Sequence, residues 1–230
     1  RSRRMTEPAL YRWPASTEFG RPVPKTKFYE RGNVRAAVRE KFVDDIQRIT
    51  WAYKLADATI HLAGSAKVPE IQVFTIETKG TDVADDVLAA IDRSIHFPVI
   101  FEVKGPEQIR MVAAQKTLGG AKPRVGTYFT TDWAPVDLPR KPLPTAIDLA
   151  GLYEAIIARL LPLQTRDGET VSAATDRMNE ARKLQREISA LEKRLRAEPQ
   201  LNRKIDLRRQ LTDREATLAE LTAQTPNTRG

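Results

Sequence analysis

The stretch that decides the fold is EIQVFTIETKGTDVADDVLAAIDRSIHFPVIFEVK, residues 70–104. Its two ends, 70–77 and 98–104, are rich in β-branched and aromatic residues, and the segment between them, 83–94, has the apolar spacing of a helix. Two short strands joined by a crossover helix are expected to lie side by side and parallel, because a right-handed crossover returns the chain beside its first strand. The sequence therefore predicts an α/β domain.

The segments that follow extend this sheet and cover it. A Gly-Pro turn leads from the second strand into an alternating run at 108–116, which predicts an antiparallel partner. A further strand is expected at 125–131, and the apolar residues of 147–161 predict a helix buried against the sheet. We place the α/β domain, a mixed sheet with flanking helices, at residues 33–165.

Residues 1–32 contain four prolines among several aromatic residues. The prolines exclude a long helix, and so many aromatic side chains are not expected to remain in water. We predict an extended N-terminal arm that covers a sheet edge or a core face. The alternative is a platform of aromatic and arginine side chains for single-stranded nucleic acid.

The C-terminal part carries the pattern of a coiled coil. In 171–197 apolar residues recur at spacings of three and four, and the pattern resumes in 200–223 after Pro199. Because the link between these segments is so short, the second helix must return antiparallel to the first. The sequence thus predicts a helical hairpin, or antiparallel coiled coil, at 169–223.

The expected contacts of this hairpin follow from its seam, and pair Leu191 with Leu207, Ile188 with Leu211, and Ala181 with Leu218. Two arginines, Arg177 and Arg214, interrupt the apolar seam, and we expect the hairpin to be weaker at these positions. The tail at 224–230 is expected to be disordered.

The composition limits the compartment and the partners. The chain of 230 residues has no cysteine and a net charge of +8. It therefore has no disulfide framework or thiolate metal site, which favours a reducing compartment. No apolar run approaches the roughly 20 residues of a membrane span. We expect a cytoplasmic protein without membrane contact. Its basic excess lies in 1–48 and 166–230, and the part between them is nearly neutral. Basic ends favour contact with nucleic acid or with an acidic protein partner, and a soluble surface of mixed charge is the alternative.

The sharpest catalytic candidates are Asp57, Glu77 and Lys79. Glu77 and Lys79 share one face at the end of a strand, and a carboxylate two residues before a lysine, with an Asp from a preceding strand, is an arrangement with which nucleases bind a divalent ion and activate water. Asp57 and Glu77 are the candidate ligands for Mg²⁺. The structural alternative is that a strand-end Glu and Lys are simply solvated, and no other cofactor is indicated.

The order of elements supports this candidate. It consists of a helix at 33–48, extended pieces at 51–55 and 58–62, a strand at 70–77, a helix at 83–94 and a strand at 98–104. This order resembles the α-β-β-β-α-β core of the PD-(D/E)XK nuclease fold. A nuclease-like fold without catalysis is the alternative that remains open.

Three cationic residues of the helix at 33–48 are candidates for nucleic-acid binding. Arg35, Arg39 and Lys41 lie off the apolar stripe of that helix, where they can reach phosphates. A solvated helix face is the alternative.

Three runs together carry a resemblance to a known family: KFYERGNVRAAVREKFVDDIQRITWAYKL, EIQVFTIETKG with DVLAAIDRSIHFPVIFEV, and RKLQREISALEKRLRAEPQLNRKIDLRRQL. They are similar to a bacterial family of uncharacterised proteins encoded beside helicases and DNA methyltransferases in restriction and phage-defence loci. The resemblance covers most of the chain and implies an accessory role in such a system, without supplying site residues.

The leading hypothesis is a non-catalytic accessory subunit that docks on a helicase or DNA methyltransferase and engages DNA. Two alternatives stay open. One is a Mg²⁺-dependent nuclease of the PD-(D/E)XK type, and the other is a coiled-coil dimerisation module that forms a homodimer.

Overall fold

The computed structural model describes residues 10–30, 34–120, 122–162 and 165–223. The chain divides into two compact units, residues 1–160 and 161–230. We call them the α/β unit and the hairpin unit, and each is described by itself.

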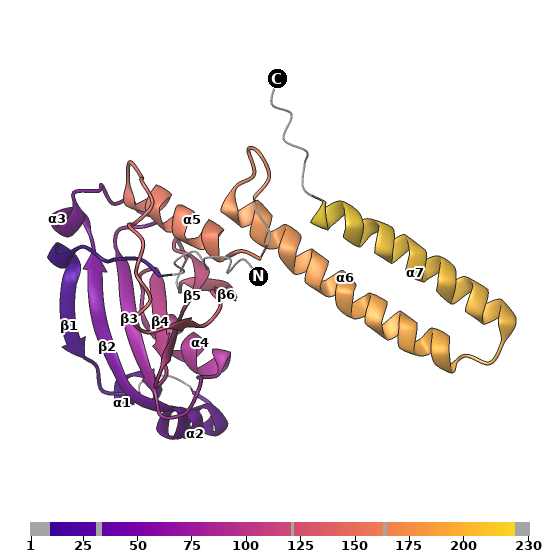
Figure 1. Ribbon diagram of the computed structural model, residues 1–230, viewed down its shortest axis with the longest axis horizontal. Helices are drawn as coiled ribbons and strands as arrows, with labels where there is room; N and C mark the ends of the chain where they lie inside the picture. Colours follow the sequence, from indigo (N-terminus) through magenta and orange to yellow (C-terminus); the bar gives the residue numbers. More distant parts are fainter. Residues whose placement is uncertain (1–9, 31–33, 121, 163–164, 224–230) are drawn as a thin grey trace, which may run out of the picture. The chain divides into compact units, whose positions relative to one another are not determined.

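A seven-stranded mixed sheet is the centre of the α/β unit (Figure 1). Its strands are β1 (Glu18–Pro22), β2 (Ile46–Leu55), β3 (Ile71–Thr78), β4 (Val99–Lys104), β5 (Gln108–Thr117), β6 (Arg124–Thr130) and β7 (Ala134–Pro135). The order across the sheet is β1-β2-β3-β4-β5-β6, and β7 pairs with β5. β3 and β4 are parallel, with Phe74 opposite Phe101, and β5 runs antiparallel to β4. The mixed α/β sheet predicted from residues 70–104 is therefore confirmed.

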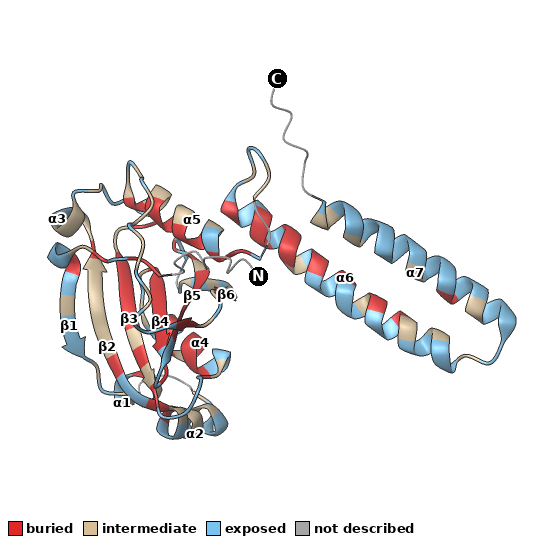
Figure 2. Ribbon diagram, in the orientation of Figure 1, coloured by how far each residue is buried: buried red, intermediate tan, exposed pale blue. Residues whose placement is uncertain are grey.

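The described residues of the α/β unit also form one 3₁₀ helix, η1 (Ala15–Thr17), and five α-helices: α1 (Thr26–Tyr29), α2 (Ala36–Asp45), α3 (Asp57–Ile60), α4 (Asp85–Ser94) and α5 (Leu149–Leu160). The crossover helix α4 buries Val87, Leu88 and Ile91 in a core shared with Phe42 of α2 and with one face of the sheet. Figure 2 shows that most of β3 and β4 is buried, with residues of intermediate burial toward the C-terminal end of β3. Apolar residues at a spacing of three and four thus bury one side of α4, as its sequence pattern predicts.

The stretch between α2 and α4 differs from expectation. The helix expected at 33–48 ends at Asp45, because the β-branched residues that follow pair with β3 and extend β2 to ten residues. The piece expected to be extended at 58–62 instead begins as the helical turn α3. This fully described stretch therefore holds two strands, not three, and the predicted α-β-β-β-α-β order is not followed.

The N-terminal arm forms part of the α/β unit over its described residues. β1 pairs antiparallel with β2 and covers that edge of the sheet. Tyr11 and Trp13 are buried, and the Trp13 indole N–H donates to Glu102 Oε1 at 2.7 Å. Arg140 donates to both oxygens of the same carboxylate, at 2.6 and 3.0 Å. Glu102, 3% exposed on β4, thus links the arm to a segment more than a hundred residues later.

Two long helices, α6 (Val171–Ala197) and α7 (Leu201–Thr222), make up the hairpin unit (Figure 1). They pack against each other in opposite directions, since Glu187 pairs with Arg214 and Arg177 lies beside Leu221. This register agrees with the predicted pairing of Ile188 with Leu211. The tail at 224–230 lies outside the described residues. No described helix combines the length and the apolar character that crossing a membrane requires.

Candidate functional site

The structure assigns Lys79 and Glu77 to local contacts with α2 and β2. The Lys79 ammonium donates to the carbonyl of Val43 at 2.6 Å, and its backbone N–H donates to the carbonyl of Asp45 at 2.8 Å. Both carbonyls belong to the last turn of α2, where the helix dipole favours a cation. Glu77 lies 3.6 Å from the Arg48 guanidinium on the neighbouring strand. Lys79 therefore caps a helix, and Glu77 pairs with a cation.

Asp57 lies at the other end of these strands. Leu55 pairs with Ile71 at the start of β3, whereas Arg48 pairs with Glu77 near its end. Six residues of strand separate these positions, which is roughly 20 Å at the rise of a β-strand. The structure therefore brings Glu77 and Lys79 near each other but does not bring Asp57 to them.

The surroundings of Asp57 explain its position in structural terms. It is the first residue of α3, where a carboxylate is favoured by the helix dipole. The backbone N–H of Ala56 donates to Thr59 Oγ1 at 2.9 Å and completes the start of that turn.

A divalent cation does not fit the candidate trio. Asp57 and Glu77 lie too far apart to share an ion, and Glu77 faces a guanidinium. Within the described ranges, no three His, Cys, Asp or Glu side chains gather closely enough to bind a metal ion. We therefore derive no metal-dependent step for these residues.

The three cationic residues predicted for nucleic acid have different surroundings. Lys41 is paired with Asp86 at 2.6 Å, and the Arg39 guanidinium lies 5.1 Å from the centre of the Tyr29 ring. Arg35 precedes the first turn of α2 and lines a pocket between α2 and α4. α2 therefore does not present these residues as one uniform row of phosphate-binding groups.

The base of the hairpin contains a cluster that the sequence pattern did not indicate. Arg177 forms two parallel hydrogen bonds to the Glu169 carboxylate, at 2.7 and 2.8 Å, and a third to the carbonyl of Leu221 at 2.9 Å. Arg166 donates to the carbonyl of Glu220 at 2.6 Å. Both arginines thus bind the last carbonyls of α7, and we call this set of residues the base clamp.

The base clamp corrects the expectation that Arg177 weakens the seam. Its side chain is 8% exposed and its guanidinium is paired, so the position joins the two helices. The hydrogen bonds from Arg177, together with the charge of Arg166, hold the pKa of Glu169 at about 2. Arg214, in contrast, is exposed and forms a 3.4 Å ion pair with Glu187, which is worth little at a surface.

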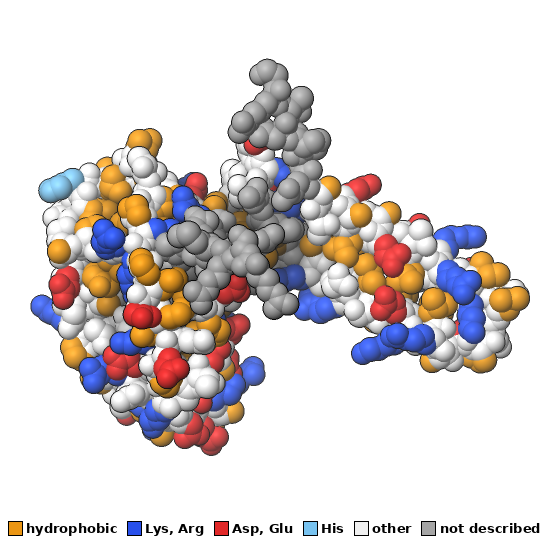
Figure 3. All heavy atoms as spheres, viewed as in Figure 1, with side chains coloured by type: hydrophobic (Ala, Val, Ile, Leu, Met, Phe, Trp, Pro, Cys, Tyr) orange, Lys and Arg blue, Asp and Glu red, His pale blue; other side chains and the backbone are white. Residues whose placement is uncertain are grey.

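The charges of the hairpin are divided along its length. Its distal half, residues 182–211, contains ten Lys or Arg and four Asp or Glu. Its proximal half, residues 166–181 with 212–223, contains three Lys or Arg and seven Asp or Glu. Nine of the ten distal cationic residues are exposed, all except Lys204. Figure 3 shows several blue side chains at the turn end of the hairpin.

The sequence pattern also did not indicate a buried ion pair in the α/β unit, between Lys116 and Asp92. Lys116 on β5 is 0% exposed and forms an ion pair of 2.5 Å with Asp92 of α4. Burial lowers the pKa of Lys116 and raises the pKa of Asp92, and their attraction partly offsets both effects. Because the pair is closed off from solvent, it supports the fold and is not a reactive site.

Comparison with known proteins identifies a family but no relative of known function. The family model described as "Domain of unknown function (DUF4391)" matches residues 12–218. No curated protein and no solved structure matches the chain. The matched range includes both the sheet and most of the two long helices, so the hairpin is part of the family domain.

Proposed function

The chain belongs to the DUF4391 family, and from this premise we propose that it is a non-catalytic accessory subunit that binds DNA through the distal half of its hairpin. Its partner is a helicase or a DNA methyltransferase of a bacterial restriction or anti-phage system. The division of charge along the hairpin carries the DNA part of the proposal. The resemblance to proteins encoded in such loci supports the choice of partner.

The composition of the distal half favours contacts with the phosphate backbone. Its exposed cationic residues occur on both helices, and no aromatic residue occurs between 166 and 223. Single-stranded nucleic acid is usually bound by stacking bases on aromatic rings, which this unit lacks. Lysine and arginine side chains bind the phosphates of a duplex irrespective of base sequence. We therefore expect binding to duplex DNA with little sequence preference.

The proximal half of the hairpin is suited to support the distal half and not to bind DNA itself. The acidic excess of the proximal half repels phosphates. Arg166 and Arg177, the two arginines of the base clamp, already bind the last carbonyls of α7. A ligand of high negative charge is thus directed to the far end of the hairpin.

A salt titration tests the DNA contact. Binding of the intact chain to a fluorescently labelled 20-base-pair duplex is followed by anisotropy between 50 and 200 mM NaCl, since log Kobs falls by about 0.9 per neutralised phosphate for each unit of log[salt]. The variant replaces four distal cations with glutamine: Arg194, Arg196, Arg203 and Arg208. If each binds one phosphate, the salt slope is expected to fall by about 3.6.

A matched control removes the same charge from the α/β unit by replacing Lys67, Lys104, Lys122 and Arg159 with glutamine. All four are exposed, and the control is expected to keep the wild-type slope. Equal slopes for the distal variant and the control would contradict the DNA proposal.

The partner is tested separately by size-exclusion chromatography of the intact chain with a candidate helicase or DNA methyltransferase from a bacterial restriction or anti-phage system. Co-elution is expected for the wild type. A chain that ends at Leu161 is compared with it, and equal co-elution of both would remove the hairpin from the docking surface.

A coiled-coil dimerisation module is the second candidate, and one observation favours it. Leu201 and Ile205 are 72% and 49% exposed, one turn apart at the start of α7, and a second copy could cover them. The absolute mass from light scattering tests this: a dimer that becomes a monomer when both residues are changed to serine would favour this candidate. A monomeric wild type would exclude it.

A further inference from the structure

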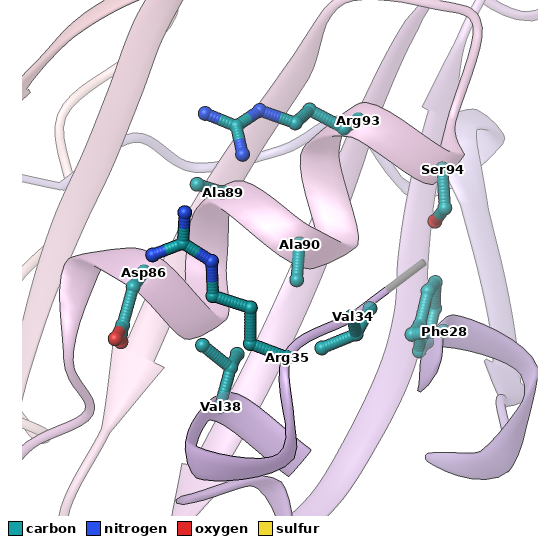
Figure 4. Close-up of a pocket in the computed structure, with 9 residues that line it drawn as sticks. All are labelled: Phe28, Val34, Arg35, Val38, Asp86, Ala89, Ala90, Arg93 and Ser94. Atoms are coloured by element: carbon teal, nitrogen blue, oxygen red, sulfur yellow. The ribbon is translucent and has the colours of Figure 1, made fainter. Parts of the chain in front are cut away.

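A pocket of about 500 Å³ lies between α2 and α4, with α1 at one side. Its walls are apolar and include Phe28, Val38 and Ala89, and the guanidinium groups of Arg35 and Arg93 stand at its rim (Figure 4). This volume is typical of sites for small ligands, which combine mostly apolar walls with a few polar groups. Neither the family description nor the proposed function assigns a role to it.

The electrostatics of this pocket favour an anion. Arg35 and Arg93 form no ion pair with any of the described residues. The carboxylate that lines the pocket, Asp86, is paired with Lys41 at 2.6 Å. α2 also begins without a side-chain cap and without an acidic residue in its first turn, which adds positive potential beside Arg35. The rim therefore has two arginines without an ion-pair partner among the described residues.

The walls restrict the rest of the ligand. The aromatic ring in the pocket belongs to Phe28, which is 5% exposed and packs at 6.5 Å from the ring of Phe42. It therefore offers no free face on which a nucleobase could stack. Valine and alanine side chains, including Val34 and Ala90, supply the remaining apolar surface. Such walls gain most from contact with an aliphatic chain.

We infer that this pocket binds a small aliphatic ligand with one anionic head group, a carboxylate or a phosphate. The head group accepts hydrogen bonds from Arg35 and Arg93, and the chain lies against the apolar walls between α2 and α4. Arginine suits both head groups, because its planar fork matches the oxygen atoms of either one.

A titration followed by amide NMR of the intact chain tests this inference. The probes are octanoate, octyl phosphate and octyltrimethylammonium, which have the same chain and differ in the charge of the head. We expect octanoate or octyl phosphate to shift the amides of α2 and α4, and the comparison of these two identifies the preferred head group. Equal binding of the cationic probe, or shifts confined to other elements, would overturn the inference.

Three variants locate the site. Arg35→Gln and Arg93→Gln are each expected to weaken binding of the anionic probe about tenfold, the effect of one lost hydrogen bond to a charged group. Arg159→Gln removes the same charge from the exposed side of α5 and is expected to leave binding unchanged. Ala90→Phe fills the pocket and is expected to abolish binding. Unchanged affinity in the two rim variants would refute the site, even if Ala90→Phe fails to fold.

This site is independent of the proposed DNA contact. The pocket lies in the α/β unit, and the DNA contact lies in the hairpin unit. The titration with small probes therefore succeeds or fails irrespective of the result with DNA.

Discussion

Replacing Lys116 with methionine tests how the α/β unit tolerates a buried charge. The Lys116 ammonium donates to the carbonyls of Asp92, Ile95 and Phe97 at 2.8, 2.8 and 2.7 Å, and also pairs with the Asp92 carboxylate. It thereby binds the carbonyls at the C-terminal end of α4. Tyr128 donates to the second carboxylate oxygen at 2.8 Å. Methionine is close to lysine in length and lacks the ammonium, so it removes the contacts of Lys116 and leaves Tyr128 as a donor to Asp92.

The expected cost is about 3–5 kcal/mol of unfolding free energy at pH 7, because removing one partner leaves the other charge buried without compensation. The loss also changes the pH dependence. Burial already raises the pKa of Asp92, and without the ammonium this pKa rises further. A carboxyl group with a raised folded pKa binds its proton more tightly in the folded state, so stability falls as pH rises through that pKa. The deficit of Lys116→Met is therefore expected to narrow when the pH is lowered from 7 to 5.

Urea unfolding followed by tryptophan fluorescence measures this effect. All three tryptophans, Trp13, Trp51 and Trp133, belong to the α/β unit, so the signal reports on that unit alone. Lys54→Met is the control, because Lys54 forms an ion pair with Glu70 at 3.2 Å and is itself 37% exposed. We expect the control to cost less than about 1 kcal/mol. A Lys116→Met variant within about 1 kcal/mol of the wild type would refute the argument that this buried ion pair stabilises the α/β unit.

Three further predictions concern the clamp and the arm. Glu169→Gln is expected to destabilise the hairpin unit by about 1–2 kcal/mol at pH 7 after allowance for solvent screening. Because the folded pKa of about 2 lies below the ordinary 4.5, the wild type should lose this stabilisation as the pH falls from 4.5 to 2. Hydrogen exchange of the α7 amides measures both effects. Arg177→Met should accelerate amide exchange in the last turn of α7, and Arg186→Met, an exposed change on the same helix, should not. Trp13→Phe removes the donor to the buried Glu102 and should cost about 1–3 kcal/mol in urea unfolding, and an unchanged midpoint would contradict that role.

Local patterns in the sequence were sufficient for much of the fold. The run at 70–104 predicts the parallel pair, because strands with apolar residues on both faces and a helix with one apolar side are visible from spacing alone. The bounds of the strands predicted from residue 70 onward agree to within one or two residues, as in 70–77 against 71–78 for β3. The piece predicted at 51–55 is only the second half of β2. The helix predicted at 171–197 agrees with α6 at both ends, since Pro199 and the short link fix where it stops.

The arrangement of Asp57, Glu77 and Lys79 was harder to predict, because it depends on which end of a strand each residue occupies. Asp57 follows a β-rich run, and sequence alone does not tell that this run pairs antiparallel with β3. That pairing decides whether Asp57 lies beside Glu77 or at the opposite end. Asp57 and Thr59 favour the start of a helix and so indicate the turn at α3. The neighbouring β-branched Ile60 favours a strand, and the prediction followed that preference.

Buried polar pairs were missed because their partners are distant in sequence. Lys116 and Asp92 are 24 residues apart, and Trp13 and Glu102 are 89 apart. A lysine within a strand pattern is ordinarily exposed on the solvent face. The alternation of β5 places Lys116 on the face that α4 covers, and only the crossover geometry shows that α4 ends above it. Arg177 was misjudged because the carbonyl of Leu221 that it binds belongs to the other helix, and Glu169 lies in the segment before α6.

The base of the hairpin stabilises the unit, and its distal half is left to bind a ligand. This difference follows from how a pair of helices is stabilised. Helices gain most of their stability from tertiary packing, and α7 has one buried residue, Leu207. The hairpin unit therefore needs polar contacts at its base, and the base clamp supplies them by joining the end of α7 to the start of α6. Nine of the ten cations of residues 182–211 are exposed, so they can reach a ligand. A ligand can therefore bind the distal half without breaking the contacts that hold the two helices together at their base.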